Sequence, residues 1–471
     1  MKKIIAFATL FYLIAFTSHA NIRLPAVLGS NMVLQQQSKV KLWGWADPSE
    51  MIYVTTSWNN KTDSVKTTRD ANWQLIAETP AAGGPYTVTF KGHNTITLDN
   101  VLIGEVWICS GQSNMEMNEQ WGLPDVKAEL PTATANKNIR FFYIPKTTSS
   151  TPQDDCKASW TLCDSNTLKA FSAVGFFFAK KLSADLNVPI GLINANWGGT
   201  PAEVWTPADL VSNDPELKAS AEKQQPYDWW PKTPGATFNG MLAPVTNFSI
   251  AGAIWYQGEG NTIAPYTYSK LLTTMIDSWR KAWNKNISFY YVQIAPFTYE
   301  NNFVGSIIRE QQAKAMRHDN VGMVVTTDLV NDTTDIHPKN KHDVGYRLAN
   351  WALAETYHKQ GITYKSPTYK NIDVQKDKAV ISFDNVPTGL MAKDKNLTAL
   401  FIAGADKVFY PAMAKIENDK LIVWSKQVVQ PVAVRFSFTN AGIGNLFSKE
   451  GLPVAPFRTD DWELDTSKVS K

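Results

Sequence analysis

The stretch GEVWICSGQSNMEM, residues 104–117, organises the interpretation of the whole chain. Its apolar half, around Val106, Trp107 and Ile108, is typical of a buried strand. Small and polar residues follow, and a helix is expected to start directly after them. At such a turn, free backbone N–H groups and the positive end of the helix can stabilise a developing oxyanion. Ser113 is therefore a candidate nucleophile, and the alternative is that its hydroxyl only caps the helix.

The first twenty residues have the features of an export signal. Positive charge at Lys2 and Lys3 precedes an apolar run over residues 4–16, and small residues lead to Ala20. We expect cleavage after Ala20. No later stretch is apolar enough to span a membrane, so we expect an exported protein, periplasmic or secreted, that carries no membrane anchor.

Composition excludes several classes of partner. The chain has 471 residues, of which 44% are hydrophobic and 19% are charged, as in globular proteins of two or three domains. Removing Lys2 and Lys3 with the signal lowers the formal net charge from +3 to +1, so neither nucleic acid nor a membrane surface is indicated. No Cys/His spacing resembles a metal site, and no cofactor is expected. Cys156 and Cys163 share one irregular segment, which would allow a disulfide in an oxidising compartment.

The pattern of strands and helices changes twice along the chain. Residues 21–101 contain short alternating strands, which indicates an antiparallel β-domain. Residues 102–363 alternate strand with helix, which favours an α/β domain with a largely parallel sheet and helices on both faces. Ligands then lie at the carboxyl ends of the strands, where Ser113 is. Residues 364–471 return to strands, and one arrangement packs this C-terminal β-region against the N-terminal one, since chain ends often lie close together.

A serine nucleophile requires a base, and histidine suits neutral pH. We set aside the histidines of the signal, the N-terminal β-domain and the helix ends, namely His19, His93, His318 and His358. This leaves His337 and His342. His337 stands in a polar loop after a strand and before a helix, with Asp332 and Asp335 near enough in sequence to orient its ring. The alternative is a solvated loop histidine with capping aspartates.

Two further turns end predicted strands. Residues 194–200 offer glycine N–H groups, including that of Gly199, and residues 255–261 offer the side chains of Gln257, Glu259 and Asn261. Glycines at these places would also serve simple tight turns. However, four polar turns at one sheet edge each carry a part that an acyl-transfer site needs, which favours a catalytic interpretation.

Four motifs give the chain a specific resemblance. GQSNM (residues 111–115), WGGT (197–200), WYQGE (255–259) and DIHP (335–338) occur in this order. Together they resemble the sialate O-acetylesterase family within the SGNH hydrolases. NMVLQ (31–35) and PVAPFRTDDW (453–462) are also similar to this family, so the resemblance covers almost the whole mature chain.

The resemblance implies a flavodoxin-like SGNH hydrolase domain, no metal, and removal of acetyl groups from sugar hydroxyls. It makes Ser113 the nucleophile and His337 the base. It also implies an oxyanion hole formed by the backbone N–H groups of Ser113 and Gly199 with a side chain from residues 257–261.

The third member of the catalytic triad departs from the wider SGNH pattern. That pattern places an aspartate three residues before the histidine, where this chain has Thr334. The orienting group is therefore Asp335, a backbone carbonyl or Glu259, and we name Asp335.

The substrate is expected to be a glycan or another O-acetylated sugar. The resemblance implies O-acetylated sialic acids, whereas relatives that deacetylate xylan and other plant polysaccharides make these an alternative. A sialic carboxylate would favour a nearby cation, and Lys339, Lys341 and Arg347 follow the base in sequence. A hypothesis of another class is a non-catalytic carbohydrate-binding protein, against which the presence of both Ser113 and His337 argues.

Overall fold

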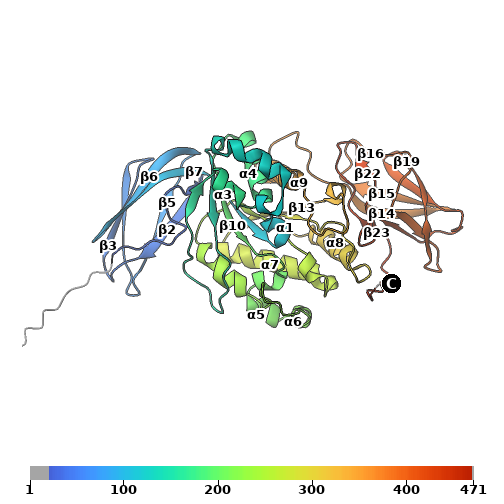
Figure 1. Cartoon of the computed structure of the whole chain (residues 1–471), viewed down its shortest axis with the longest axis horizontal. Helices are drawn as coiled ribbons and strands as arrows, with labels where there is room; N and C mark the ends of the chain where they lie inside the picture. Colours follow the sequence, from blue (N-terminus) through green and yellow to red (C-terminus); the bar gives the residue numbers. More distant parts are fainter. Residues whose placement is uncertain (1–20, 469–471) are drawn as a thin grey trace, which may run out of the picture.

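The computed structural model describes residues 21–468 of the chain. An N-terminal β-region, a central α/β region and a C-terminal β-region follow one another along the longest axis of the molecule (Figure 1). This confirms the predicted fold class, an α/β domain flanked by antiparallel β-regions. The predicted signal, residues 1–20, lies outside the described residues. Within residues 21–468, no helix combines the length and the apolar character that crossing a membrane requires.

The central sheet is parallel except at one edge. Its strands lie in the order β13-β12-β11-β7-β10-β8-β9, and only the β8–β9 pair is antiparallel. Every residue of β10, β11 and β12 is buried, because these largely apolar strands are covered on both faces. The bounds are β7 (Thr95–Gly111), β8 (Ile139–Tyr143), β9 (Trp160–Leu162), β10 (Ile190–Asn196), β11 (Gly252–Tyr256), β12 (Ser288–Val292) and β13 (Val321–Val324).

Four long helices cover the two faces of this sheet. α4 (Ala173–Leu186) and α9 (Lys341–Trp351) pack together on one face, and α7 (Tyr268–Trp283) and α8 (Val304–Ala315) contribute to the core on the other (Figure 1). Ser172 caps the start of α4, and its hydroxyl accepts the N–H of Gly175 at 3.1 Å. Shorter helices connect the main elements: α1 (Ser113–Glu116), α2 (Pro124–Glu129), α3 (Ser165–Lys169), α5 (Ala208–Ser212) and α6 (Pro215–Glu222).

β7 joins the N-terminal β-region to the central sheet. Its first part pairs with β6 and β1, and its last part pairs with β10 and β11. The expected boundary at residue 101 therefore falls inside a strand. The remaining strands of this region are β1 (Val33–Gln35), β2 (Lys39–Trp45), β3 (Met51–Thr56), β4 (Lys61–Lys66), β5 (Asn72–Glu78) and β6 (Gly83–Lys91).

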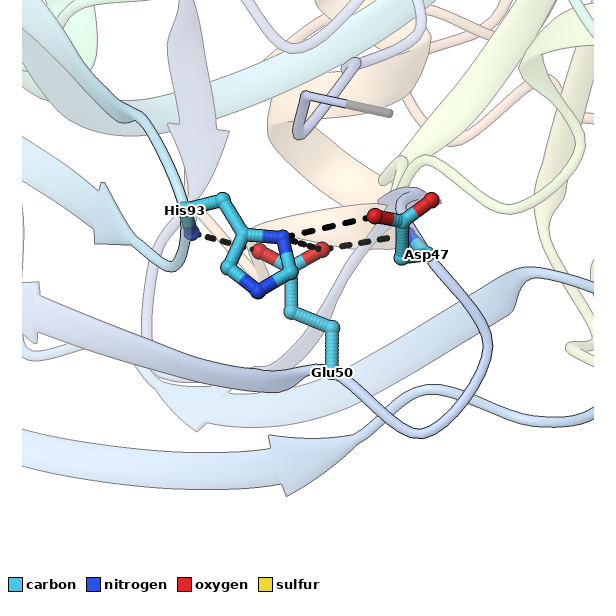
Figure 2. Close-up of side chains that lie close together, drawn as sticks. All are labelled: Asp47, Glu50 and His93. Atoms are coloured by element: carbon cyan, nitrogen blue, oxygen red, sulfur yellow. Dashed lines mark hydrogen bonds and ion pairs between the residues drawn. The ribbon is translucent and has the colours of Figure 1, made fainter. Parts of the chain in front are cut away.

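A buried carboxylate ties two loops of the N-terminal β-region together (Figure 2). Glu50 accepts the backbone N–H of Asp47 at 3.0 Å and that of His93 at 2.6 Å. The His93 ring lies 3.4 Å from both carboxylates. The potential ligand atoms of these three side chains lie within 4.8 Å of one another, but the two backbone donors already give the buried Glu50 oxygens partners. We therefore assign the cluster a structural role.

The C-terminal β-region is built from antiparallel strands and lies at the opposite end of the molecule from the N-terminal one (Figure 1). The prediction that the two regions pack together is therefore wrong. Instead, the C-terminal region contacts α8, where Arg458 pairs with Glu310 at 2.9 Å and Asn440 accepts the N–H of Gly305. Its strands are β14 (Thr368–Gln375), β15 (Lys378–Asp384), β16 (Leu390–Ala392), β17 (Leu400–Ala403), β18 (Phe409–Pro411), β19 (Met413–Glu417), β20 (Lys420–Trp424), β21 (Ala433–Phe436), β22 (Leu446–Ser448) and β23 (Phe457–Arg458).

The suggested disulfide is not formed. Cys109, Cys156 and Cys163 are all free thiols. β9 runs between Cys156 and Cys163, and Cys163 is buried in the core on the α4 side of the sheet.

Candidate active site

Ser113 opens α1 immediately beyond the carboxyl end of β7. The turn depends on Gly111, whose φ is +136°. A Cβ at Gly111 would lie 2.2 Å from the carbonyl oxygen of Tyr256 at the end of β11, so only glycine allows the two strand ends to approach this closely. The serine therefore stands at the carboxyl edge of the sheet, as the sequence predicts, and the structure places it beyond a strand that lies between β10 and β11.

The structure brings Ser113 and His337 together. The Oγ of Ser113 lies 2.9 Å from Nε2 of His337, although the two residues are 224 positions apart in the chain. His337 comes from the loop between β13 and α9, and the Trp121 ring packs edge-on against its imidazole at 5.3 Å. This is the separation that a nucleophile and its general base require. His342 is instead paired with Asp343 and packs on Tyr346.

Asp335 lies beside the imidazole but is not hydrogen-bonded to it. Its Oδ1 is 3.9 Å from Nδ1 of His337, which is too long for a hydrogen bond. The same oxygen accepts the backbone N–H of His337 at 2.9 Å. Asp335 therefore shapes the loop and places a negative charge near the ring. Asp332 hydrogen-bonds to Thr334 rather than to His337.

The surroundings of His337 favour its neutral form. Burial lowers the pKa of the imidazole, and the positive charge of Lys341 lowers it further. The charge of Asp335 acts in the opposite direction but does not reverse the shift in pKa. A neutral imidazole can accept the proton of Ser113, so the electrostatics agree with the geometry.

A cavity of about 560 Å³ opens over the Ser113–His337 pair. One wall is aromatic, and two of its side chains are well exposed, Tyr227 to 48% and Trp229 to 65%. The third, Trp230, packs on Gly199, where a Cβ would lie 2.1 Å from the indole. The lining comprises Gln112, Ser113, Glu116, Trp121, Lys146, Gly198, Gly199, Gln224, Gln225, Tyr227, Trp229, Trp230, Glu259, Gly260, Thr262, Ile263, Ile336 and His337.

Two backbone donors beside Ser113 remain available. Among the described residues, the N–H groups of Ser113 and Gly199 have no hydrogen-bond acceptor. The neighbouring N–H of Gly198 differs, because it donates to the carboxylate of Glu116 at 2.6 Å. Ser113 supplies a first-turn helix N–H, and Gly199 has a φ of +82° that suits glycine.

Gln257 and Asn261 do not line the cavity. Both are buried, and the Gln257 amide donates to Oδ1 of Asn261 at 2.8 Å and to the carbonyl of Thr200 at 3.2 Å. Asn261 also accepts the N–H of Ala202 and donates to Glu203. These side chains brace the turn that carries Gly199. Glu259, from the same segment, does reach the cavity.

Several lining residues carry no signal in the four motifs. The segment QQPYDWW, residues 224–230, supplies most of the aromatic wall. Three aromatic residues in a polar, proline-containing segment were the available clue, since clustered exposed apolar side chains rimmed by polar residues mark binding sites. Gln112 belongs to the GQSNM motif but was given no role there; its Oε1 accepts the N–H of Gly260 at 3.1 Å, which links the Ser113 turn to the Glu259 turn.

The cations that follow His337 in sequence are all engaged with protein groups. Lys341 is buried and donates to Asn114 at 2.6 Å. Arg347 pairs with Asp328 at 2.6 Å, and Lys339 donates to the carbonyl of Trp121 at 3.3 Å. A different lysine, Lys146, lines the cavity, and its Nζ forms an ion pair with Glu116 at 2.6 Å.

Comparisons with known proteins agree with one another. Residues 103–354 match a family described as carbohydrate esterase, sialic acid-specific acetylesterase. Sialate O-acetylesterase of Pongo abelii is 28% identical over 406 residues, covering 76% of each chain, and that of Mus musculus is 28% identical over 417 residues, covering 75% of this chain and 76% of the relative. The crystal structure of a carbohydrate acetylesterase from Xanthomonas citri has a TM-score of 0.85 and 33% identity, covering 94% of this chain and 100% of that one.

Proposed function

Because the chain belongs to the sialic acid-specific family of carbohydrate acetylesterases, we propose that it removes O-acetyl groups from sugars with Ser113 as nucleophile and His337 as general base. One observation carries the assignment of these residues. The Ser113 hydroxyl lies 2.9 Å from Nε2 of His337, and both residues line a cavity that has an aromatic wall.

The proposed reaction has two steps. First, Nε2 of His337 takes the Ser113 proton as Oγ attacks the acetyl carbonyl carbon, and the N–H groups of Ser113 and Gly199 stabilise the oxyanion. The carbon–oxygen bond to the sugar then breaks, and the sugar oxygen takes the proton from His337. In the second step, water gives its proton to His337 and attacks acetyl-Ser113, and acetate leaves as the proton returns to Oγ.

Asp335 is the proposed orienting residue. Its negative charge near Nδ1 would stabilise the imidazolium that forms in each step, and its bond to the His337 N–H holds the loop. The separation of 3.9 Å would have to close for a direct hydrogen bond, which is consistent with catalytic contacts that shorten once substrate is bound.

Sialic acids are the first candidate substrates, as the names of the relatives suggest. An observation of the cavity favours a second candidate, an uncharged O-acetylated sugar in a polysaccharide such as xylan. Lys146 already pairs with Glu116, so a sialic carboxylate would have to compete for it. The exposed rings of Tyr227 and Trp229 suit the apolar face of either kind of sugar.

Two experiments test this proposal. Labelling with a serine-reactive organophosphonate, followed by peptide mass spectrometry, is expected to modify Ser113. Absence of labelling would favour a non-catalytic carbohydrate-binding protein instead. An acetate-release assay that compares O-acetylated sialic acid with acetylated xylan then decides the substrate, and release from xylan alone would eliminate sialic acids.

We also propose export to the periplasm or the medium, which the composition of residues 1–20 supports. N-terminal sequencing of the protein from its native host is expected to begin at Asn21. A chain that retains Met1 and stays in the cytoplasm would contradict this proposal.

A further inference from the structure

A buried lysine lies behind the Ser113–His337 pair. Lys341, the first residue of α9, is only 1% exposed. Its Nζ donates to Oδ1 of Asn114 at 2.6 Å. The amide of Asn114 donates in turn to Oε1 of Glu259 at 2.7 Å and to the carbonyl of Ile336 at 3.1 Å. A single side chain, Asn114, therefore connects the Ser113 turn, the Glu259 turn, the His337 loop and α9.

This arrangement is costly for the fold. Burial lowers the pKa of Lys341 to about 7 and raises the pKa of Glu259. The other carboxylate oxygen of Glu259, Oε2, is buried and has no hydrogen-bond partner among the described residues. A lysine and a carboxylate that are buried and bridged by a neutral amide contribute less than a direct pair would, so stability alone does not explain them. Groups of this kind cluster at functional sites.

We propose that Lys341, acting through Asn114, is a positioning residue for the Ser113–His337 pair and that its positive charge adds to the effect of burial in keeping the imidazole neutral. This inference rests on the proposed function. It assigns Lys341 to the esterase reaction itself, although this lysine touches neither Ser113 Oγ nor the cavity.

The proposed positioning role follows from where Asn114 and Ile336 stand in the chain. Asn114 is the residue after the nucleophile, and Ile336, whose carbonyl it holds, is the residue before the base. Asp335 makes no hydrogen bond to the ring, so the position of His337 depends on its backbone contacts and on Trp121. Fixing the Asn114 amide therefore fixes the separation of Oγ and Nε2.

The electrostatic part has a definite sign. The charges that act on His337 are Lys341 and Lys339, which lower its pKa, and Asp335, which raises it. Those that act on Lys341 are Glu259 and Asp335, which raise its pKa, and Lys339, which lowers it, while the Tyr256 ring lies 5.1 Å from Nζ. Lys341 is charged below about pH 7, the range in which a free imidazole takes up its proton. The charge of Lys341 therefore opposes protonation of His337 in the pH range in which that protonation would stop the reaction.

The test measures the pH dependence of two reactions of Lys341→Met: hydrolysis of p-nitrophenyl acetate, and the rate at which an organophosphonate labels Ser113. The acid limb of both profiles is expected to move up by about one pH unit, so that rates on the limb fall about tenfold. Lys339→Met is the matched control, because it removes the same charge from a neighbouring but exposed position. Its shift is expected to be clearly smaller.

Two further variants keep the inference testable if Lys341→Met folds poorly. Glu259→Gln keeps an acceptor for Asn114 but removes the charge that raises the pKa of Lys341, so the acid limb should move in the same direction by a smaller amount. Asn114→Ala should lower kcat by about 10- to 100-fold with little change in KM, as expected when two reacting groups lose alignment.

The outcomes separate this inference from the proposed function. If the wild-type protein is not labelled at Ser113, the esterase assignment itself fails. If the wild type is labelled, but Lys341→Met and Glu259→Gln keep the wild-type acid limb and Asn114→Ala keeps the wild-type kcat, then Lys341 has no part in the reaction and the inference is refuted.

Discussion

Replacing Gly199 with alanine tests the proposed oxyanion hole at a position where the structure allows little adjustment. The residue has a φ of +82°, a left-handed conformation that costs an L-amino acid about 1–2 kcal/mol. A Cβ there would lie 2.1 Å from the Trp230 ring, so either the turn or the indole has to move. Movement of the turn displaces the residue 199 N–H from its place beside Ser113, whereas movement of the indole alone would leave this donor in place.

The expected loss follows from the role of this donor. Removing one oxyanion-hole hydrogen bond costs about 2.7–4 kcal/mol of transition-state stabilisation, or about 100- to 1,000-fold in kcat. The fold should lose the conformational cost of about 1–2 kcal/mol, and the displacement that the Trp230 contact forces adds to this loss. KM for an acetylated sugar should also rise, since Trp230 belongs to the cavity wall.

Gly198→Ala is the matched control for this measurement. A Cβ at Gly198 would lie 3.0 Å from a carboxylate oxygen of Glu116, the end of a flexible side chain, and the Gly198 N–H is already bonded to that carboxylate. We expect kcat to fall far less than in Gly199→Ala. Steady-state kinetics and thermal unfolding of both variants decide the question. If Gly199→Ala retains kcat within about threefold of wild type while a crystal structure of the variant shows the residue 199 N–H displaced, Gly199 is not an oxyanion donor.

Three further predictions concern the groups that move the proton. Ser113→Ala and His337→Ala should each abolish hydrolysis of an acetyl ester without unfolding the protein, and the double variant should be no worse than either, because the two residues act as a unit; comparable turnover by Ser113→Ala would rule out its role as nucleophile. Because burial and Lys341 lower the pKa of His337, activity should persist below the pH at which ordinary histidines become protonated, and kcat/KM should be lost as the pH falls through that lowered pKa; an acid limb above about pH 6.5 would contradict this. Asp335→Asn should reduce kcat at the pH optimum more than Glu259→Gln does, and the reverse order would assign the orienting role to Glu259.

The sequence predicted those parts of the structure that depend on local pattern. The apolar run before Ser113 and the alternation of strand with helix over residues 102–363 indicated a largely parallel sheet, which the structure confirms. Parallel strands end at a common edge, so the Ser113 turn and the His337 loop were expected to meet there, and the structure brings them together.

The features that sequence did not predict depend on side-chain direction and on packing between distant segments. Gln257 and Asn261 stand in the expected turn, yet their amides point to Thr200, Ala202 and Glu203. Nothing in the order of residues distinguishes a side chain that faces a cavity from one that braces the turn beneath it. The position of the C-terminal β-region was missed for a related reason, since it depends on contacts such as Arg458 with Glu310 across the surface of α8.

The order of the sheet explains why the cavity wall comes from the segment between β10 and β11. Among the strands that carry the site, β7 lies between β10 and β11, although it comes first in the chain. The connection from β10 to β11 must therefore pass β7, and it leaves from the carboxyl edge where Ser113 stands. Gly199 begins this connection and Trp230 folds back onto it. The proposed oxyanion donor, Gly199, and the proposed sugar-binding wall, which includes Trp230, are thus parts of one crossover connection. A substitution that displaces Trp230 should therefore impair both catalysis and sugar binding.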